Sequence, residues 1–247
     1  LATWPVRTLT RGHPDQLRNP FGVAVTAQGR VVVTEVEVDR VIEVFSPDGA
    51  PVAQWHPAGH TFLWFGSPQP YDVATDGQGT IYVAVANVQQ VQRFSPTGEH
   101  LSSWGSANGV QAPRGIAVDG QGRTYVSSAG NCIQQFSTAG RFLARWGSEG
   151  PQAGRFRHPQ GIAVDQQGHV YVADAGNDRI QELSSAGEAL AVWSMPGTLD
   201  LRPGSARNEL PGAFAMPMAV AVDAQGNLYV ADSGNNRVQK LTRASGP

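Results

Sequence analysis

The sequence has little charge, one cysteine and one lysine, and each shortage excludes a class of protein. Charged residues make up 15% of the 247 residues, and 18 Lys and Arg against 20 Asp and Glu give a formal charge of -2. The arginines are scattered singly, so the chain lacks the basic face that phosphate neutralisation requires, which disfavours nucleic-acid binding. A single cysteine, Cys132, excludes an internal disulfide framework.

Long apolar runs are missing as well. None approaches the roughly 20 residues of a membrane span, and no charged-then-apolar signal segment opens the chain. Because the first residue is Leu1 rather than Met, we expect a processed or excised piece of a longer protein. The arginine-rich, lysine-poor composition resembles that of bacterial extracytoplasmic domains.

Glycine and proline, in contrast, are abundant. The 29 Gly and 17 Pro are nearly one residue in five, a density of chain reversals that excludes a helical bundle or a long coiled coil. Hydrophobic residues make up 40% of the chain, enough to bury a core, which disfavours intrinsic disorder. The composition predicts a turn-rich globular protein.

A heptapeptide of the type Pro-x-Gly-Ile-Ala-Val-Asp recurs along the chain. Each copy is followed by a Gln-Gly turn and then by two further β-branched runs, such as 170–174 and 179–183. In the first four copies a fourth run ends in tryptophan. The five copies begin at Pro20, Pro70, Pro113, Pro159 and Pro217, and the four tryptophans are Trp55, Trp104, Trp146 and Trp193.

Four short strands per unit of about 40 to 50 residues predict an all-β, five-bladed β-propeller of four-stranded antiparallel blades. We expect a single domain over 1–247 and a monomer. The fifth copy stops after its third strand, so we predict that an N-terminal strand at 4–10 completes the last blade and closes the ring. The expected blades lie near 20–66, 67–109, 110–156, 157–213 and 214–247.

The repeated motifs, with Val-Tyr-Val-Ala-Asp-x-Gly-Asn-x-Arg-Ile-Gln and a closing Trp-Gly, resemble the NHL-repeat family of β-propellers. The resemblance covers residues 20–241 and is best in copies four and five. Val85 and Val88 replace the Asp and Asn of the second motif in copy two, and Glu35 and Val38 replace them in copy one. Such departures are places where a site can be built into a repetitive ring.

The resemblance implies that the residue after each repeat proline faces the mouth of the central channel. These residues differ between copies although the surrounding motif is nearly constant. They fit a small, partly apolar ligand that is anionic or hydroxylated, with Arg114 as the polar contact; the alternative is that they only fill a narrow channel. The candidate ligand-binding residues are Phe21, Tyr71, Arg114, Gln160 and Met218, with Asp72 beside Tyr71 as a partner for Arg114 or a carboxylate at the mouth.

The sequence gives little support for a metal site or for a catalytic nucleophile. Peptide amidating lyases, which resemble this fold, carry metal-binding histidines on several blades, but no copy has a histidine after its proline. Glu35, Glu37 and Asp39 alternate onto one side of an extended chain, where a weak cation site is the alternative to a solvated acidic turn. There is no Gly-x-Ser-x-Gly elbow or phosphate loop. We therefore predict no metal, no cofactor and no catalytic residue.

Two loops break the period. The segment 55–65 is rich in aromatic residues, and we expect it to cap the channel or to contact a partner through His56, His60, Phe62, Trp64 and Phe65, unless it folds back on its blade. The segment 195–215, which is rich in Pro, Gly and Arg, is expected to form a flap or a linker. The repeated Asp174, Asn177 and Arg179 are expected to fix a turn by hydrogen bonding.

The sequence thus favours a non-enzymatic binding or sensor module that recognises a protein, a peptide or a small ligand at one face or at the channel mouth. The first alternative is a hydrolase or lyase whose site at the channel mouth uses Arg114, Asp72 and Tyr71. The second alternative, an RNA-binding propeller, is permitted by the resemblance and disfavoured by the charge balance.

Overall fold

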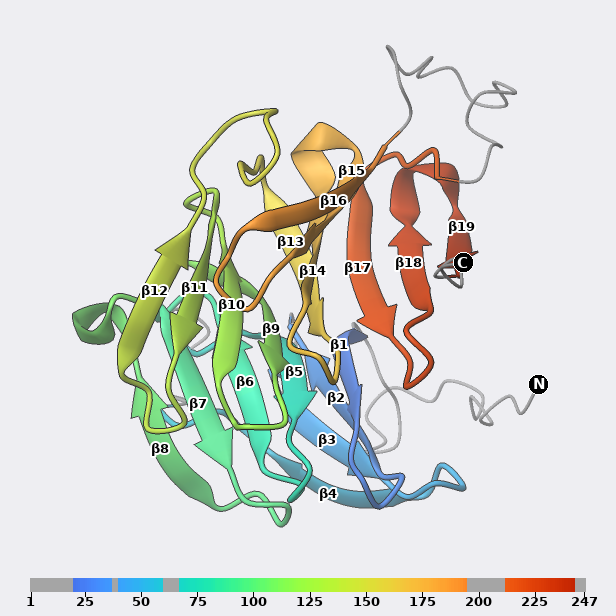
Figure 1. Ribbon diagram of the computed structural model, residues 1–247. Helices are drawn as coiled ribbons and strands as arrows, with labels where there is room; N and C mark the ends of the chain where they lie inside the picture. Colours follow the sequence, from blue (N-terminus) through green and yellow to red (C-terminus); the bar gives the residue numbers. More distant parts are fainter. Residues whose placement is uncertain (1–19, 37–39, 60–66, 195–211, 243–247) are drawn as a thin grey trace. The chain divides into compact units, whose positions relative to one another are not determined.

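The computed structural model describes residues 20–36, 40–59, 67–194 and 212–242, and the structural statements below concern these residues. They form five antiparallel sheets, so the protein is all-β and has the fold of a five-bladed β-propeller (Figure 1). No helix in these ranges is long and apolar enough to cross a membrane.

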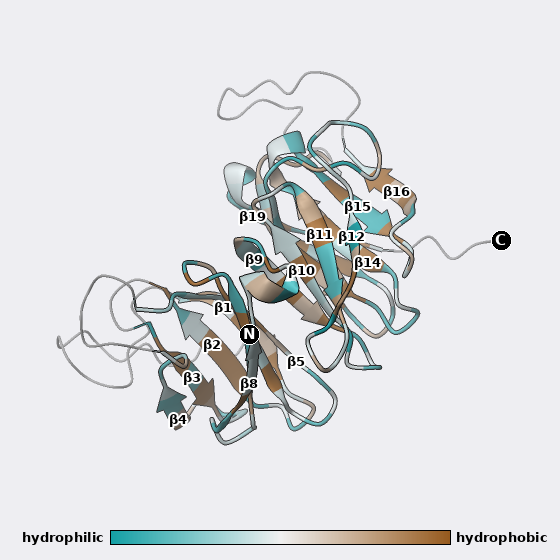
Figure 2. Cartoon of the chain, turned by 90° about the vertical axis from the view of Figure 1, so that its left-hand side faces the viewer, coloured by the Kyte–Doolittle hydropathy of each residue, from teal (hydrophilic) through white to brown (hydrophobic). Residues whose placement is uncertain are grey.

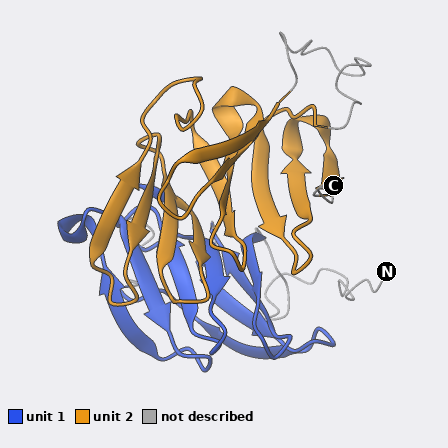
Figure 3. Cartoon of the chain, in the orientation of Figure 1, with its two compact units in different colours: residues 1–113 blue, residues 114–247 orange. Residues whose placement is uncertain are grey.

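The chain divides into two compact units, residues 1–113 and 114–247 (Figure 3). Unit 1 holds the first two blades, in each of which four strands pair in sequential order. Their bounds are β1 Pro20–Val25, β2 Val31–Glu35, β3 Ile42–Phe45, β4 Pro51–Trp55, β5 Pro70–Thr75, β6 Ile81–Val85, β7 Gln90–Phe94 and β8 His100–Trp104.

Unit 2 holds the other three blades, of which the last has three strands in the described residues. Short 3-10 turns η2 (Ala175–Asn177) and η4 (Ser233–Asn235) join its strands, as η1 (Ser106–Asn108) does in unit 1. The strand bounds are β9 Pro113–Val118, β10 Thr124–Ser128, β11 Cys132–Phe136, β12 Phe142–Trp146, β13 Pro159–Val164, β14 Val170–Asp174, β15 Arg179–Leu183, β16 Ala189–Trp193, β17 Pro217–Val222, β18 Leu228–Asp232 and β19 Arg237–Leu241.

The strands and turns follow the repeat. Each repeat proline begins an innermost strand, and each of the four tryptophans ends an outermost one, as predicted. The turn glycines adopt the left-handed backbone that only glycine enters without strain; Gly168, for example, has φ of +84°. The predicted N-terminal strand 4–10 lies outside the described residues, so closure of the ring stays a prediction.

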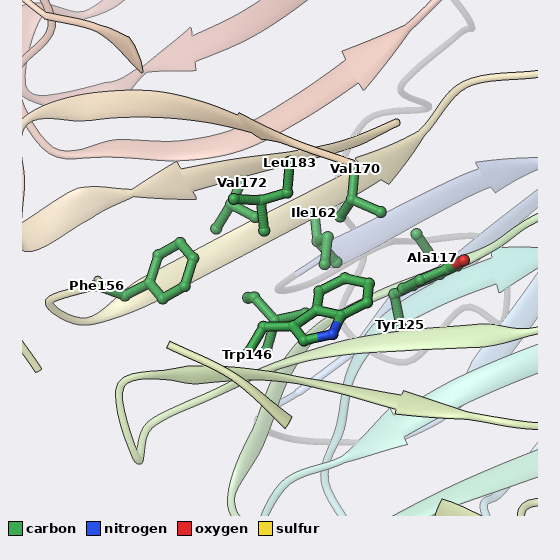
Figure 4. Packing of buried hydrophobic residues seen from close by; sticks show 9 residues of the cluster. Ala117, Tyr125, Trp146, Phe156, Ile162, Val170, Val172 and Leu183 are labelled. Carbon is green, nitrogen blue, oxygen red and sulfur yellow. The ribbon is translucent and has the colours of Figure 1, made fainter. Parts of the chain in front are cut away.

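The core lies where neighbouring blades pack. Middle strands such as β6 and β14 are buried at every position, because they have a partner strand on both sides and a sheet against their faces. Figure 2 shows the apolar character concentrated on strands such as β2. Between the blades of β9–β12 and β13–β16, Trp146 and Tyr125 pack with Phe156, Val170 and Leu183 (Figure 4). Burial of a side chain such as Phe156 contributes about 2–3 kcal/mol.

Candidate functional site at the start of the innermost strands

Two aromatic side chains meet at the start of the innermost strands of unit 1. Phe21 follows the first proline of β1 and Tyr71 follows the first proline of β5, and their ring centroids are 4.6 Å apart at an angle of 60°. Phe21 remains 50% exposed and Tyr71 is half-buried. The structure therefore brings together two of the residues predicted to bind a ligand, and leaves an aromatic surface open to solvent.

Asp72, the residue after Tyr71, lies against Gly22, the residue after Phe21, because glycine leaves room for it. A Cβ atom at Gly22 would stand 2.7 Å from Asp72 Oδ1 and 2.7 Å from Asp72 Cα. The hydroxyl of Thr34 on β2 accepts the Gly22 N–H at 3.0 Å and donates to the Tyr71 carbonyl at 3.3 Å. This buried hydroxyl ties β1 to β5 and so fixes the spacing of the two rings and the carboxylate.

Unit 2 repeats the arrangement with different side chains. Arg114, Gln160 and Met218 follow the first prolines of β9, β13 and β17, and all three are half-buried. Ser127 on β10 accepts the Gly115 N–H at 2.7 Å and donates to the Gln160 carbonyl. The inner strands of neighbouring blades are thereby held together, as Thr34 holds β1 and β5.

The ring of five residues predicted from the sequence, together with Asp72, thus has one part in each unit. Phe21, Tyr71 and Asp72 are together in unit 1, and Arg114, Gln160 and Met218 lie on neighbouring inner strands of unit 2. A single site made of all of them, and a pairing of Asp72 with Arg114, stay predictions.

The bridging hydroxyls of Thr34 and Ser127 were not predicted from the sequence. Thr34 and Ser127 occupy the same register position on the second strand of their blades, where the other blades have alanine. At this repeated position two blades have a hydroxyl residue and the other three have alanine. This difference could have indicated from the sequence that the two hydroxyls have a special role. The alanines are Ala84, Ala173 and Ala231.

The repeated Asp and Arg of copies four and five form ion pairs at fully buried aspartates, which fix the turn as predicted and also hold a loop. Arg179 Nε is 2.6 Å from Asp174 Oδ2, and the guanidinium also donates to the carbonyls of Pro151, Gln152 and Arg155. Arg237 and Asp232 make the same pair at 2.8 Å. These polar groups pack a loop onto a blade.

In blades two and three neutral residues replace this pair, whereas blade one keeps charged residues, Glu35 and Arg40, at the two positions. Blade two has Val85 and Gln90 in the places of Asp174 and Arg179, and Asn87 holds its loop by accepting the Gln69 N–H at 2.7 Å. Blade three has Cys132, which begins β11 and is fully buried, as expected for a small packed residue. Burial raises the pKa of this thiol, which disfavours its use as a nucleophile.

A second loop clamp was not predicted. A glutamine at the same register of the third strand accepts a loop N–H and donates to a loop carbonyl; Gln181, for example, accepts from Gly154 at 2.9 Å and donates to Arg155 at 2.6 Å. Gln92 binds Ala58 in this way, and Gln239 binds Gly212 and Ala213. Glu43 stands at this position in blade one. The recurring glutamine of the third run was visible in the sequence.

The structure describes only some of the remaining predicted groups. In the described ranges no three His, Cys, Asp or Glu side chains gather in a way that holds a metal ion. His56 is exposed, with Nδ1 at 3.4 Å from the Arg40 carbonyl. Glu35 is buried at the end of β2. Most of the 195–215 loop lies outside the described residues. So do the other residues of the predicted contact loop and of the predicted carboxylate run, namely His60, Phe62, Trp64, Phe65, Glu37 and Asp39.

A hollow of about 230 Å³ occurs elsewhere in unit 2. It lies between the last two blades and is lined by Tyr171, Glu182, Trp193 and Leu228 among others. These residues belong to middle and outer strands rather than to the start of β13 or β17. The hollow is therefore a feature of blade packing, separate from the candidate site.

An aspartate caps the first turn of most blades. Because this aspartate titrates, we expect the stability of the fold to depend on pH. Burial raises the pKa of Asp119, but hydrogen bonds from Arg123, Tyr125 and the Gln121 N–H outweigh it, so the pKa lies below its ordinary value. Because the folded value is depressed, the stability contributed by Asp119 is present above the unfolded pKa of about 3.9 and is lost as the pH falls through the folded pKa.

We expect Asp119→Asn to lower the free energy of unfolding at pH 7 by about 1 kcal/mol and to flatten its decline below pH 4. Urea unfolding at a series of pH values measures both effects. The exposed Glu188→Gln is the control, and an Asp119→Asn profile parallel to wild type would contradict the assignment.

The comparisons with known proteins agree with the repeat. The sequence model of the NHL repeat matches residues 156–183 and 214–241, the segments from Phe156 to the end of β15 and from Phe214 to the end of β19. "Protein brain tumor" of Drosophila melanogaster is 29% identical over 111 residues, which are 45% of this chain and 10% of that protein. The chain therefore matches only a small part of this relative's length.

Solved structures of lyases share the fold. A streptogramin B lyase superposes with a TM-score of 0.62 at 12% identity, over 92% of this chain and 70% of the other. A catalytically inactive virginiamycin B lyase from Staphylococcus aureus with quinupristin gives 0.62 at 17% identity, over 95% and 84%. At these identities the likeness concerns the fold. The segments 156–183 and 214–241 are thus matched as NHL repeats, and the repeated motifs extend the resemblance to this family over the other blades.

Proposed function

We propose that the chain is a binding module that takes its ligand at the start of the innermost strands. The carrying observation is the pair of Phe21 and Tyr71, whose ring centroids are 4.6 Å apart with Phe21 half exposed, while the Asp72 carboxylate lies against Gly22 on the same two strands. Exposed aromatic faces next to a polar group on a rigid framework are typical of ligand sites.

The side chains support a small, partly apolar ligand with a polar group. In unit 1 two rings offer stacking surfaces, and Thr34 fixes the strands that carry them. In unit 2 Arg114 offers a guanidinium and Gln160 an amide, which suit a carboxylate, phosphate or hydroxyl. The ligand class is therefore one with both an apolar surface and an anionic or hydroxylated group.

The test is a thermal-shift and calorimetric screen with inorganic phosphate, acetate, glucose and tryptophan as probes. We expect at least one probe to raise the melting temperature, and Tyr71→Ala and Arg114→Ala each to weaken its binding about tenfold or more, since each removes a principal contact. Arg141→Ala, at an exposed arginine of β12's preceding turn, is the control. Equal affinity in all the variants would refute the site.

A lyase is the second candidate, and the fold shared with a streptogramin B lyase and a virginiamycin B lyase over more than nine-tenths of this chain favours it. Its residues would be Arg114, Asp72 and Tyr71. Incubation with quinupristin followed by mass spectrometry tests it. Turnover that Asp72→Asn abolishes would establish catalysis at this place, whereas intact quinupristin after prolonged incubation would contradict a lyase acting on this compound.

A further inference from the structure

The tyrosines of the second strands have different partners across their sheets. Four blades have a tyrosine at this position. The residue paired with it on the third strand is basic in blades two and five, an amide in blade three and an acid in blade four. Blade four thus has a carboxylate where two other blades have a cation. The pairs are Tyr82 with Arg93, Tyr125 with Gln135, Tyr171 with Glu182 and Tyr229 with Lys240.

The two basic residues lie over the rings of their tyrosines. Arg93 Cζ is 5.3 Å from the centroid of the Tyr82 ring, and Lys240 Nζ is 5.4 Å from that of Tyr229. At such distances a cation is attracted to the negative face of an aromatic ring. The repeat therefore contains a cation-binding position over the tyrosine, which the chain's own side chain fills in these two blades.

In blade four, Tyr171 and Glu182 line the hollow of about 230 Å³ that lies against the last blade. Glu182 is only 6% exposed, and its Oε1 accepts the Tyr171 hydroxyl at 3.2 Å and lies 3.6 Å from His169 Nδ1. The ring centroids of Tyr171 and Trp193 are 6.3 Å apart. The hollow thus has one acidic group among mainly apolar walls, to which Trp193, Leu228 and Leu241 contribute.

We propose that this hollow binds a small primary ammonium ion with an apolar body, whose charge lies over Tyr171 as that of Lys240 lies over Tyr229. Glu182 supplies the opposite charge, and its burial makes the attraction stronger than it would be in water. Trp193 offers a flat apolar surface to the body of the ligand. The hollow is smaller than the roughly 300–1,000 Å³ of drug-sized sites, so it suits a compact amine.

The charge of the surrounding groups selects a cation over an anion. Asp165 Oδ2 also accepts the Tyr171 hydroxyl, at 3.0 Å, and lies 3.0 Å from His169 Nδ1. With Asp165 and Glu182 ionised, these groups carry a net negative charge whether His169 is protonated or neutral. An anion would be repelled, and a neutral molecule of the same shape would gain the apolar contacts alone.

Titration calorimetry at about pH 7 with three probes of similar shape tests the proposal. We expect phenethylammonium to bind with a Kd on the order of 1 mM. Neutral 2-phenylethanol should bind at least about tenfold more weakly, because it lacks the charge that the carboxylate and the ring attract. Anionic 3-phenylpropionate should not bind.

Two substitutions at Glu182 locate the binding by copying other blades. Glu182→Gln gives blade four the amide of blade three, and should raise the Kd of phenethylammonium at least about tenfold while leaving that of 2-phenylethanol unchanged. Glu182→Lys supplies an internal cation like Lys240, should abolish binding of the amine, and serves if the glutamine variant folds poorly. The exposed Glu188→Gln, on the same blade, is the control and should bind as wild type does.

Three results would overturn the proposal. The first is that phenethylammonium does not bind, as expected if the chain's own residues fill the hollow. The second is equal affinity of the wild-type chain for the amine and the alcohol, a comparison that needs no variant. The third is an affinity for the amine that Glu182→Gln leaves unchanged, which would place the binding elsewhere on the chain.

Discussion

Replacing Arg179 by glutamine is expected to lower the free energy of unfolding by about 3–5 kcal/mol, because it leaves the fully buried Asp174 carboxylate without its cation. Asp174 Oδ2 accepts Arg179 Nε at 2.6 Å, and Oδ1 accepts the Arg157 N–H at 2.7 Å. The guanidinium also binds three loop carbonyls. Glutamine is too short to reach the carboxylate and the loop together, so the loop 150–157 loosens as well.

Urea unfolding measures the loss, with Arg141→Gln at an exposed position as a control expected to change stability by less than about 0.5 kcal/mol. The chain offers a matched rescue, because blade two has Val85 and Gln90 in the places of the pair. Asp174→Val with Arg179→Gln removes the buried charge. We therefore expect the double variant to recover at least about 1 kcal/mol relative to the single one.

A double variant as unstable as the sum of its single substitutions would show that the buried charge is not the main cost. Asp174→Asn provides an independent measure, since it keeps the shape of the side chain and removes the charge. It should be less destabilising than Arg179→Gln, because the arginine retains its three carbonyl acceptors.

The strands were predictable because the repeat constrains each of them several times. The pattern Pro-x-Gly-Ile-Ala-Val-Asp places a proline at a strand start, an apolar alternation in the strand and a capped turn after it, so each copy confirms the others. The same redundancy explains the prediction that Asp174 and Arg179 hold a turn. A pair that recurs at one place in two blades is more readily explained by packing than by catalysis.

Contacts between blades were harder to predict. The bridging hydroxyl of Thr34 binds Gly22 of its own blade and Tyr71 of the next, and this partner is 37 residues away in the sequence. The glutamine clamp of Gln181 likewise joins residues 27 positions apart. Periodicity reports a residue's place within its own sheet but not what faces it, so the candidate site could be predicted only as a set of positions.

Gly161 is such an inter-blade position, and we expect Gly161→Ala to lower the free energy of unfolding by about 2–3 kcal/mol. A Cβ at Gly161 would lie 2.6 Å from Ala219 Cα and 2.9 Å from the Met218 carbonyl oxygen. Both atoms belong to the backbone of β17, so no side-chain rotation relieves the clash. The blades carrying β13 and β17 must then separate, which also shifts Gln160 and Met218 at the candidate site.

Gly120→Ala is the matched control, because a Cβ there meets nothing within 4 Å and the backbone lies outside the left-handed region. Alanine at Gly120 should be neutral or slightly stabilising, since it restricts the unfolded chain. Equal stability of the two variants in urea would mean that the inner strands tolerate an added methyl group. A loss confined to Gly161→Ala would show that glycine in the repeat motif sets the distance between inner strands, and through it the spacing of the residues that follow each proline.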